Sequence, residues 1–191
     1  VGWDEIEYDD MAYPRTALIG YAIKSFNEYE GRVPTFSSLI KGLLVKGNET
    51  SLIKEALSIK KAVIEDDEFE VGNRTALNYG HTIGHALEVA TDYKLPHGKA
   101  VAIGCVVEDN ICKKGSSDDY VELVQDLVSE DKNIHIDYDL VFSLVKKDRK
   151  VLGDKIKIAT SQKFGEIHFE FVNLDDNFKE RMTLFLRRFF R

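Results

Sequence analysis

Apolar residues recur at intervals of three and four along most of the chain, which is the spacing of amphipathic helices. Ala100 to Val107 is apolar without interruption, so we expect the helix that contains it to be buried on most sides. The helices predicted from this pattern and from its breaks span residues 11–28, 37–45, 52–66, 73–91, 100–112, 118–129, 138–147 and 175–190.

A different pattern appears near the C-terminal end. Residues 155–160 and 167–172 alternate apolar and polar side chains, which is typical of half-buried strands, and Phe164-Gly165 lies between them. We therefore expect a β-hairpin there. A chain of 191 residues is long enough for one well-buried core, and we find no internal repeat or linker. The prediction is one mostly α-helical domain, residues 1–191, with a small β-hairpin near its C-terminus.

The charge, the apolar runs and the cysteine spacing limit which partners and which cellular compartment the sequence is compatible with. Lys and Arg number 26 and Asp and Glu number 33, a net charge of −7 that disfavours nucleic acid as a partner. No stretch has the eighteen apolar residues that a bilayer span needs, and the first ten residues are acidic, unlike a signal peptide. Cys105 and Cys112 are seven residues apart, too far for a disulfide within one helix. Together these features predict a cytoplasmic protein with reduced thiols and no membrane partner.

The predicted helix 73–91 has a polar stripe along one face. Its members are spaced 4, 3, 4 and 3 residues apart, as residues on one helical face are. Gly80 and Gly84 interrupt the same helix, each at a cost of ~1 kcal/mol relative to alanine, so we expect another backbone or a ligand to approach closely there. The stripe consists of Arg74, Asn78, His81, His85 and Glu88.

The histidines of this stripe suggest a metal site. A pair at i and i+4 can bind one metal ion, and His97 follows in a Pro-His-Gly turn that would bring a third imidazole to it. Zinc suits imidazole ligands, and iron or cobalt would also fit. The alternative is that these are ordinary surface or structural histidines. Three of the five histidines within seventeen residues favour the metal site.

Two further basic features have both a structural and a functional interpretation. Lys60 falls on the apolar face of the predicted helix 52–66, where it either extends past apolar surface to water or belongs to a site. The run at residues 146–150, which includes Arg149 and Lys150, is either a solvated face or a holder for phosphate or carboxylate.

Longer motifs surround these residues. Residues 74–88 read RxxLNYGHTxGHAxE, residues 97–104 read HGxAVAxG, residues 60–70 read KxxVxxxDxxE, and residues 148–150 read DRK. In these motifs the chain closely resembles the C-terminal domain of the 3-dehydroquinate synthase family, from about Ala17 to its end. The resemblance implies a multi-helix metal- and substrate-binding domain.

The resemblance also implies an activity. The family converts 3-deoxy-arabino-heptulosonate 7-phosphate, a sugar acid phosphate, to 3-dehydroquinate and phosphate in the shikimate pathway. NAD⁺ transiently takes a hydride, and a divalent metal, Zn²⁺ or another such as Co²⁺, binds the substrate's hydroxyls. No glycine-rich phosphate loop follows a strand in this chain, so we expect the nucleotide-binding domain to precede Val1. A homodimer is a further expectation from the family.

Site residues follow from the same motifs. The resemblance implies that His81 and His97 are metal ligands and that Asn78 and His85 face the substrate near its phosphate. The residues implied to contact the substrate or act in catalysis are Lys24, Lys60, Glu70, Arg74, Asn78, His85 and Lys150, with Arg149 as the alternative to Lys150.

The chain departs from the family pattern in ways that leave alternatives open. Tyr21 stands where the family has the glutamate that is its third metal ligand, and a neutral phenol is a weak ligand. Glu28 would substitute only if the helix were shifted by one turn. Lys99 replaces a usual glutamate, and Arg149 a lysine. The alternatives are another sugar-phosphate cyclase and a non-catalytic homologue that has lost the metal carboxylate.

Overall fold

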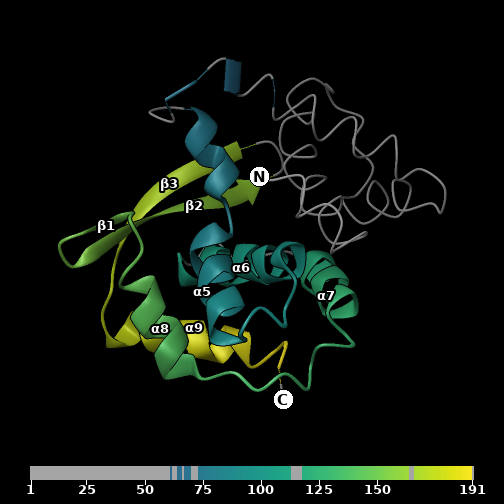
Figure 1. The fold of residues 1–191 in the computed structure, drawn as a ribbon. Helices are drawn as coiled ribbons and strands as arrows, with labels where there is room; N and C mark the ends of the chain where they lie inside the picture. Colours follow the sequence, from purple (N-terminus) through teal and green to yellow (C-terminus); the bar gives the residue numbers. More distant parts are fainter. Residues whose placement is uncertain are drawn as a thin grey trace.

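The computed structural model describes residues 61, 64–65, 67–69, 73–112, 118–163 and 166–190. The predicted helices at 11–28 and 37–45, and most of the one at 52–66, lie outside the described residues. The described elements are the 3₁₀ helix η2 (Asn73–Asn78), helices α5 (His81–Ala90), α6 (His97–Ile111), α7 (Asp118–Leu127), α8 (Tyr138–Val145) and α9 (Asp176–Leu186), and strands β1 (Val151–Leu152), β2 (Lys155–Lys163) and β3 (Glu166–Asn173) (Figure 1). The predicted class, mostly helical with a small sheet near the C-terminus, is confirmed.

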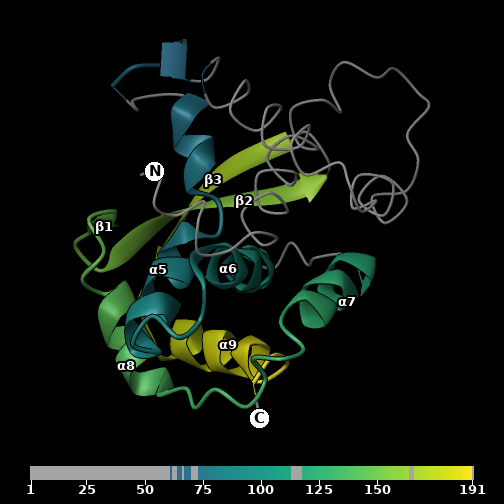
Figure 2. The ribbon, with the colours of Figure 1, turned by 45° about the vertical axis from the view of Figure 1, so that its right-hand side comes forward.

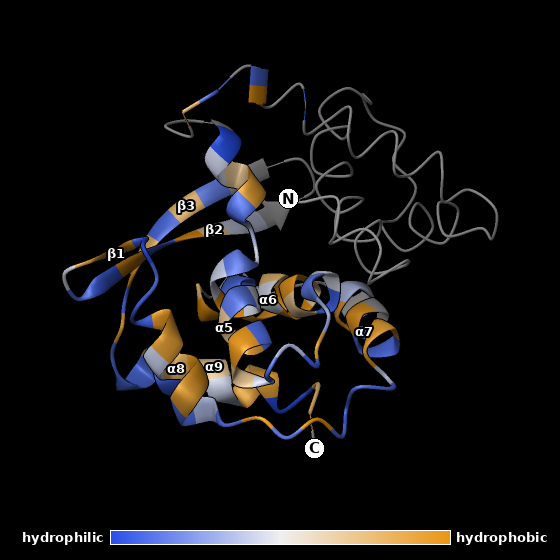
Figure 3. Ribbon diagram, in the orientation of Figure 1, coloured by the Kyte–Doolittle hydropathy of each residue, from blue (hydrophilic) through white to orange (hydrophobic). Residues whose placement is uncertain are grey.

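Helix α6 is the centre of the described part of the chain. It contacts α5, α7, α9 and β2, and in two views it lies between the sheet and α9 (Figures 1 and 2). Twelve of its fifteen residues are buried, which confirms the prediction of burial on most sides. In Figure 3 the orange of hydrophobic residues covers much of α6 and α8. Cys105 and Cys112 are both buried and free, as their spacing predicts.

Helices α5 and α6 pack unusually closely, because glycines line their contact. A Cβ atom on Gly104 would lie 1.9 Å from the carbonyl oxygen of Gly80, and one on Gly84 would lie 3.0 Å from the Cα atom of Val101. No side chain fits in either place without displacing backbone. The expectation that these glycines permit close approach of another backbone is confirmed for Gly80 and Gly84, and the approaching backbone is α6.

Two predicted helix boundaries are wrong, and both errors matter for the site. The expected helix 73–91 is broken at Gly80, whose φ of 77° is left-handed, so that η2 and α5 are separate elements. Arg74 and Asn78 therefore do not continue the α5 face that holds the histidines. The next helix begins at His97, directly after Pro96, and not at Ala100. His97 is thus the first residue of α6 and not part of a turn before it.

The sheet has the order β1-β2-β3, with both pairs antiparallel. Its β2–β3 hairpin confirms the prediction, with Ile156 opposite Val172 and Ala159 opposite Phe169, and β1 adds a short third strand. Ile156 and Ile158 are completely buried, whereas Phe169 on β3 is partly exposed. Side chains cap two helices: Asp137 accepts hydrogen bonds at the start of α8, and Asp175 at the start of α9. Within the described ranges no helix combines the length and apolar character needed to cross a bilayer.

Candidate functional site

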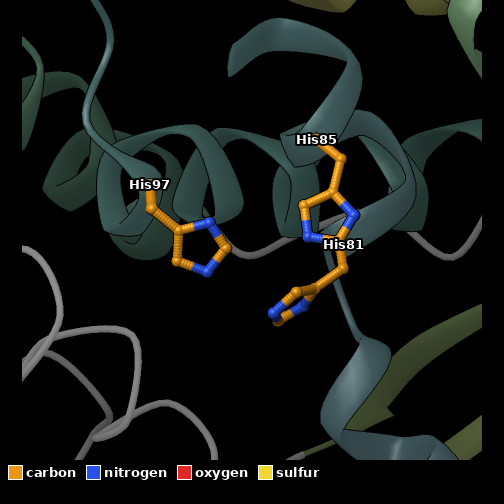
Figure 4. Close-up of side chains that lie close together, drawn as sticks. All are labelled: His81, His85 and His97. Atoms are coloured by element: carbon orange, nitrogen blue, oxygen red, sulfur yellow. The ribbon is translucent and has the colours of Figure 1, made fainter. Parts of the chain in front are cut away.

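Three imidazole rings meet where α5 begins beside the first turn of α6. His81 and His85 lie one turn apart on α5, and His97 faces them from α6 (Figure 4). One nitrogen from each ring lies within 4.8 Å of the other two. The ring centroids are 5.3 Å apart for His81 and His85, 5.4 Å for His81 and His97, and 5.8 Å for His85 and His97. The structure therefore brings together the three histidines that the sequence singles out.

Two of the three rings are held through Nδ1. His81 Nδ1 lies 3.0 Å from the carbonyl oxygen of Tyr79, and His97 Nδ1 lies 3.1 Å from Oε2 of Glu88. Because a carbonyl oxygen only accepts, Nδ1 of His81 is the nitrogen that bears the proton, and Nε2 carries the lone pair. A carboxylate on Nδ1 has the same effect at His97. This outer support of a histidine is what metal-ligating imidazoles generally have.

The environment disfavours a charge on the two α5 histidines. Burial lowers the pKa of His81 to about 3, against the effect of the Tyr79 carbonyl, and the neighbouring rings and Lys150 lower it further. Partial desolvation also lowers the pKa of His85, although Glu88 acts in the opposite direction. His81 is consequently neutral at pH 7, and the shift at His85 also favours its neutral form. A neutral imidazole has the free lone pair that a metal ion requires.

A buried carboxyl group on α6 fixes the start of α5. The first N–H groups of a helix have no partner within it, and Gly80, which precedes α5, has no side chain to supply one. Oε2 of Glu108 accepts a hydrogen bond from the Gly80 N–H at 2.9 Å, and Oε1 accepts one from the Ile83 N–H at 3.0 Å. Glu108 is fully buried. Its burial raises its pKa to about 8, despite the two N–H donors and Lys150, which lower it, while Asp109 raises it further.

Asp109, the next residue on α6, links the segment before α5 to strand β2 through two hydrogen bonds. Its Oδ2 accepts a hydrogen bond from the Tyr79 hydroxyl at 2.5 Å, and its Oδ1 accepts one from the Ser161 N–H at 3.0 Å. Sequence reasoning missed both acids. The available signal was two charged residues directly after the apolar run of the most buried helix, where unpaired charges are very costly.

An open groove with a volume of about 320 Å³ lies near the histidine cluster. Its lining includes Thr82, which follows His81 in the chain, and Lys150, whose charge acts on His81 and His85. Lys150 donates a hydrogen bond to Asp148 at 3.0 Å, and the Lys157 ammonium lies 4.4 Å from the centre of the Phe169 ring. The groove thus has a basic wall and an aromatic wall, which suits an anion with an apolar or sugar-like body. Its lining residues are Phe69, Thr75, Asn78, Thr82, Arg149, Lys150, Lys157, Ala159 and Phe169.

Of the other expected site residues, some line the groove, Arg74 does not, and the rest lie outside the described residues. Asn78, Arg149 and Lys150 line the groove beside the histidines. Arg74 is not among the lining residues, because its guanidinium donates to the carbonyl oxygen of Glu68 at 2.7 Å and its backbone N–H donates to Asp67. Thr82 and Lys157 line the groove without having been expected there. The residues that lie outside the described part of the chain are Tyr21, Lys24, Glu28, Lys60 and Glu70.

Comparison with known sequences supports this picture. The family model described as "3-dehydroquinate synthase C-terminal" matches residues 18–151. Curated relatives include the 3-dehydroquinate synthases of Pyrococcus furiosus (36% identity over 124 residues, 64% of this chain and 37% of the relative) and Pyrococcus abyssi (31% over 156 residues, 80% and 45%). The chain thus spans between about a third and half of the length of these relatives.

Among solved structures, the fold is similar to that of 2-deoxy-scyllo-inosose synthase in complex with carbaglucose-6-phosphate, NAD⁺ and Co²⁺. The TM-score is 0.67 at 20% identity, covering 93% of this chain and 50% of that one. A second structure of 2-deoxy-scyllo-inosose synthase has a TM-score of 0.64. The family match, which covers most of the chain, and the histidine cluster at the motif's centre lead to one conclusion: the chain belongs to the 3-dehydroquinate synthase C-terminal family.

Proposed function

We propose that this chain is the metal- and substrate-binding part of an enzyme that converts 3-deoxy-arabino-heptulosonate 7-phosphate to 3-dehydroquinate and phosphate. The observation that supports this most directly is the convergence of three histidines near a groove with a basic wall. In the proposal His81 and His97 hold a divalent metal, Zn²⁺ or Co²⁺. The donors fit such ions, because neutral imidazole nitrogens suit borderline metals.

The metal, when bound, supplies Lewis acidity at the hydroxyl groups of the substrate. The chain's own residues bind and orient that substrate. In the proposal Arg149, Lys150 and Lys157 neutralise its phosphate or carboxylate, and Asn78 offers an amide to a hydroxyl or a phosphate oxygen. Lys150 lines the groove and its charge acts on His81, so in the proposal a substrate in the groove extends toward the histidines.

The hydride step needs NAD⁺, which we place on a nucleotide-binding domain that acts together with this chain. The support comes from the 2-deoxy-scyllo-inosose synthase with a similar fold, which was solved with NAD⁺ and Co²⁺ and of which this chain covers half. In the proposal the role of this chain is to place the substrate's reacting carbons between the metal site and the nicotinamide.

The test supplies the chain with a nucleotide-binding domain of the family, fused or mixed, together with NAD⁺ and Zn²⁺ or Co²⁺. We expect release of phosphate and formation of 3-dehydroquinate from the heptulosonate phosphate. We expect His81→Ala to abolish both. The structural neighbour's ligand is a hexose phosphate analogue, so a hexose phosphate, which lacks the carboxylate, is the comparison substrate. Turnover of that sugar alone would support a different sugar-phosphate cyclase. No turnover of either would support a non-catalytic homologue.

A further inference from the structure

We propose that Asp109 is a positioning residue, which holds the segment before His81 against strand β2 and so fixes the histidine cluster relative to the groove. This role rests on the proposed function, because it concerns how the residues of that function are placed. Asp109 lies on α6, is 3% exposed and is not among the residues that line the groove. It therefore acts through other residues and not by contact with the substrate.

The two oxygens of Asp109 bind segments that are far apart in the sequence. Oδ2 accepts a hydrogen bond from the Tyr79 hydroxyl at 2.5 Å, and Oδ1 accepts one from the Ser161 N–H at 3.0 Å. The carbonyl oxygen of Tyr79 in turn accepts a hydrogen bond from Nδ1 of His81 at 3.0 Å. Ser161 lies on β2, the strand that also contributes to the groove wall. One carboxyl group thus connects the groove wall to the residue that orients His81.

The chain changes direction directly after Tyr79, which makes the position of this residue matter. Gly80 has a left-handed φ of 77° and separates η2 from α5, and a glycine allows more than one backbone angle at such a point. Asn78, which lines the groove, lies on one side of this junction, and His81 lies on the other. The placement of Asn78 relative to His81 therefore depends on what holds Tyr79 and Gly80.

Consecutive acids of α6 hold these two residues. Asp109 binds the hydroxyl of Tyr79, and Glu108 accepts a hydrogen bond from the Gly80 N–H at 2.9 Å. The packing of α6 also confines Gly80, because a Cβ atom on Gly104 would lie 1.9 Å from its carbonyl oxygen. An apolar side chain at position 109 accepts no hydrogen bond, whereas a satisfied buried polar network selects a single arrangement of the segments that it joins.

Tyr79→Phe tests this role, because it removes the hydroxyl and keeps the ring and the backbone carbonyl. NMR measures how fast the Nδ1 proton of His81 exchanges with water in the metal-free, complete 191-residue chain. We expect this exchange to become about 10-fold faster, because loss of a buried hydrogen bond allows local opening. The matched control is Tyr120→Phe, which removes another buried tyrosine hydroxyl, one on α7 that interacts with Cys105. Urea unfolding compares the stability of the two variants.

The assay with the nucleotide-binding domain supplied gives a second readout. We expect Tyr79→Phe to lower kcat about 10-fold while KM changes by less than about threefold, because the binding residues remain and only their relative placement is loosened. Tyr120→Phe should leave both kcat and KM unchanged.

Two substitutions at position 109 separate hydrogen bonding from charge. Asp109→Asn keeps an oxygen for the Ser161 N–H and offers its NH₂ to the hydroxyl oxygen of Tyr79, so we expect it to resemble the wild type in both readouts. Asp109→Ala keeps neither contact and should resemble Tyr79→Phe. Equal effects of the two substitutions would contradict a role that depends on hydrogen-bond geometry. Circular dichroism checks that each variant is folded.

The readouts distinguish failure of this role from failure of the proposed function. If Tyr79→Phe and Tyr120→Phe lower the free energy of unfolding alike and both leave the exchange at His81 unchanged, Asp109 is merely structural and its positioning role is wrong, while the proposed function stands. If the wild type shows no turnover, the proposed function fails, and the exchange comparison alone decides whether Asp109 positions His81.

Discussion

At the scale of single residues, the site depends on how each imidazole is held. His81 is supported by a backbone carbonyl and His97 by a carboxylate, so both present Nε2 with its lone pair. The spacing of His81 and His85 follows directly from the sequence, because residues four apart lie on one helical face. The hydrogen-bond partners of Nδ1 do not follow from the sequence, because the carboxylate of Glu88 on α5 reaches His97 on a different helix, α6.

Glu88 provides a test at this scale. We expect Glu88→Gln to weaken Zn²⁺ binding by about 10-fold to 100-fold, because the amide keeps a hydrogen-bond acceptor for Nδ1 of His97 but loses the negative charge that makes the ring a better donor. Chelator competition gives the affinity. Glu122→Gln is the matched control, because Glu122 is an exposed residue of α7 outside the cluster. Equal affinities for the two variants would mean that Glu88 does not support the metal site.

At the scale of elements, the position of α5 on α6 brings the histidines together. Glycines at 80, 84 and 104 allow the two backbones to touch, and the carboxyl group of Glu108 accepts hydrogen bonds from N–H groups at the start of α5. The glycines could be predicted as points of close approach, because their cost within a helix needs a reason. Their partner helix could not be predicted, because spacing along a chain does not say which helices pack together.

Glu108 makes stability depend on pH. In the folded chain its pKa is about 8, whereas in an unfolded chain it is close to the ordinary 4.5. Between these values the unfolded chain loses a proton that the folded chain keeps, so the contribution of this group is present below pH 4.5 and is lost as pH rises through 8. The expected slope is about 1.4 kcal/mol per pH unit for this group alone.

Urea unfolding of the metal-free chain at pH 5, 6 and 7 measures this effect. The free energy of unfolding of the wild type should fall relative to that of Glu108→Gln as pH rises, because the variant has nothing to ionise at this position. The variant should be less stable than the wild type at pH 5. In the wild type both oxygens of Glu108 accept hydrogen bonds from backbone N–H groups, whereas in the variant the amide NH₂ is a donor that faces one of these donors. Parallel profiles for the two proteins would contradict the raised pKa.

At the scale of the whole molecule, segments far apart in the sequence form the groove. Asn78 and Thr82 come from η2 and α5, Lys150 precedes β1, and Lys157 lies on β2. The basic run at 146–150 could be predicted as a place for an anion, and Arg149 and Lys150 do line the groove. Lys157 could not be predicted, because an alternating strand gives no sign of which cavity its polar face will border.

A substitution at Lys157 tests whether the substrate contacts the basic wall of the groove. We expect Lys157→Gln to raise the KM for the phosphorylated substrate by about 10-fold, the loss of one charge-assisted contact, in the assay with the nucleotide-binding domain supplied. Lys155→Gln is the matched control, because Lys155 is an exposed lysine on the same strand, β2, but does not line the groove. Metal affinity should be unchanged in both variants. An equal KM for the two would mean that substrate does not contact this wall.

By itself the sequence determined the helical class, the hairpin and the spacing of His81 and His85, because each of these depends on residues within a few positions of one another. It also showed the motif by which the family is identified. Tertiary structure alone decided that α5 begins after a break at Gly80, that Glu108 caps α5 from another helix, and that Lys157 borders the groove. These features arise from packing between residues 25 or more positions apart, where local spacing contains no information about which surfaces meet.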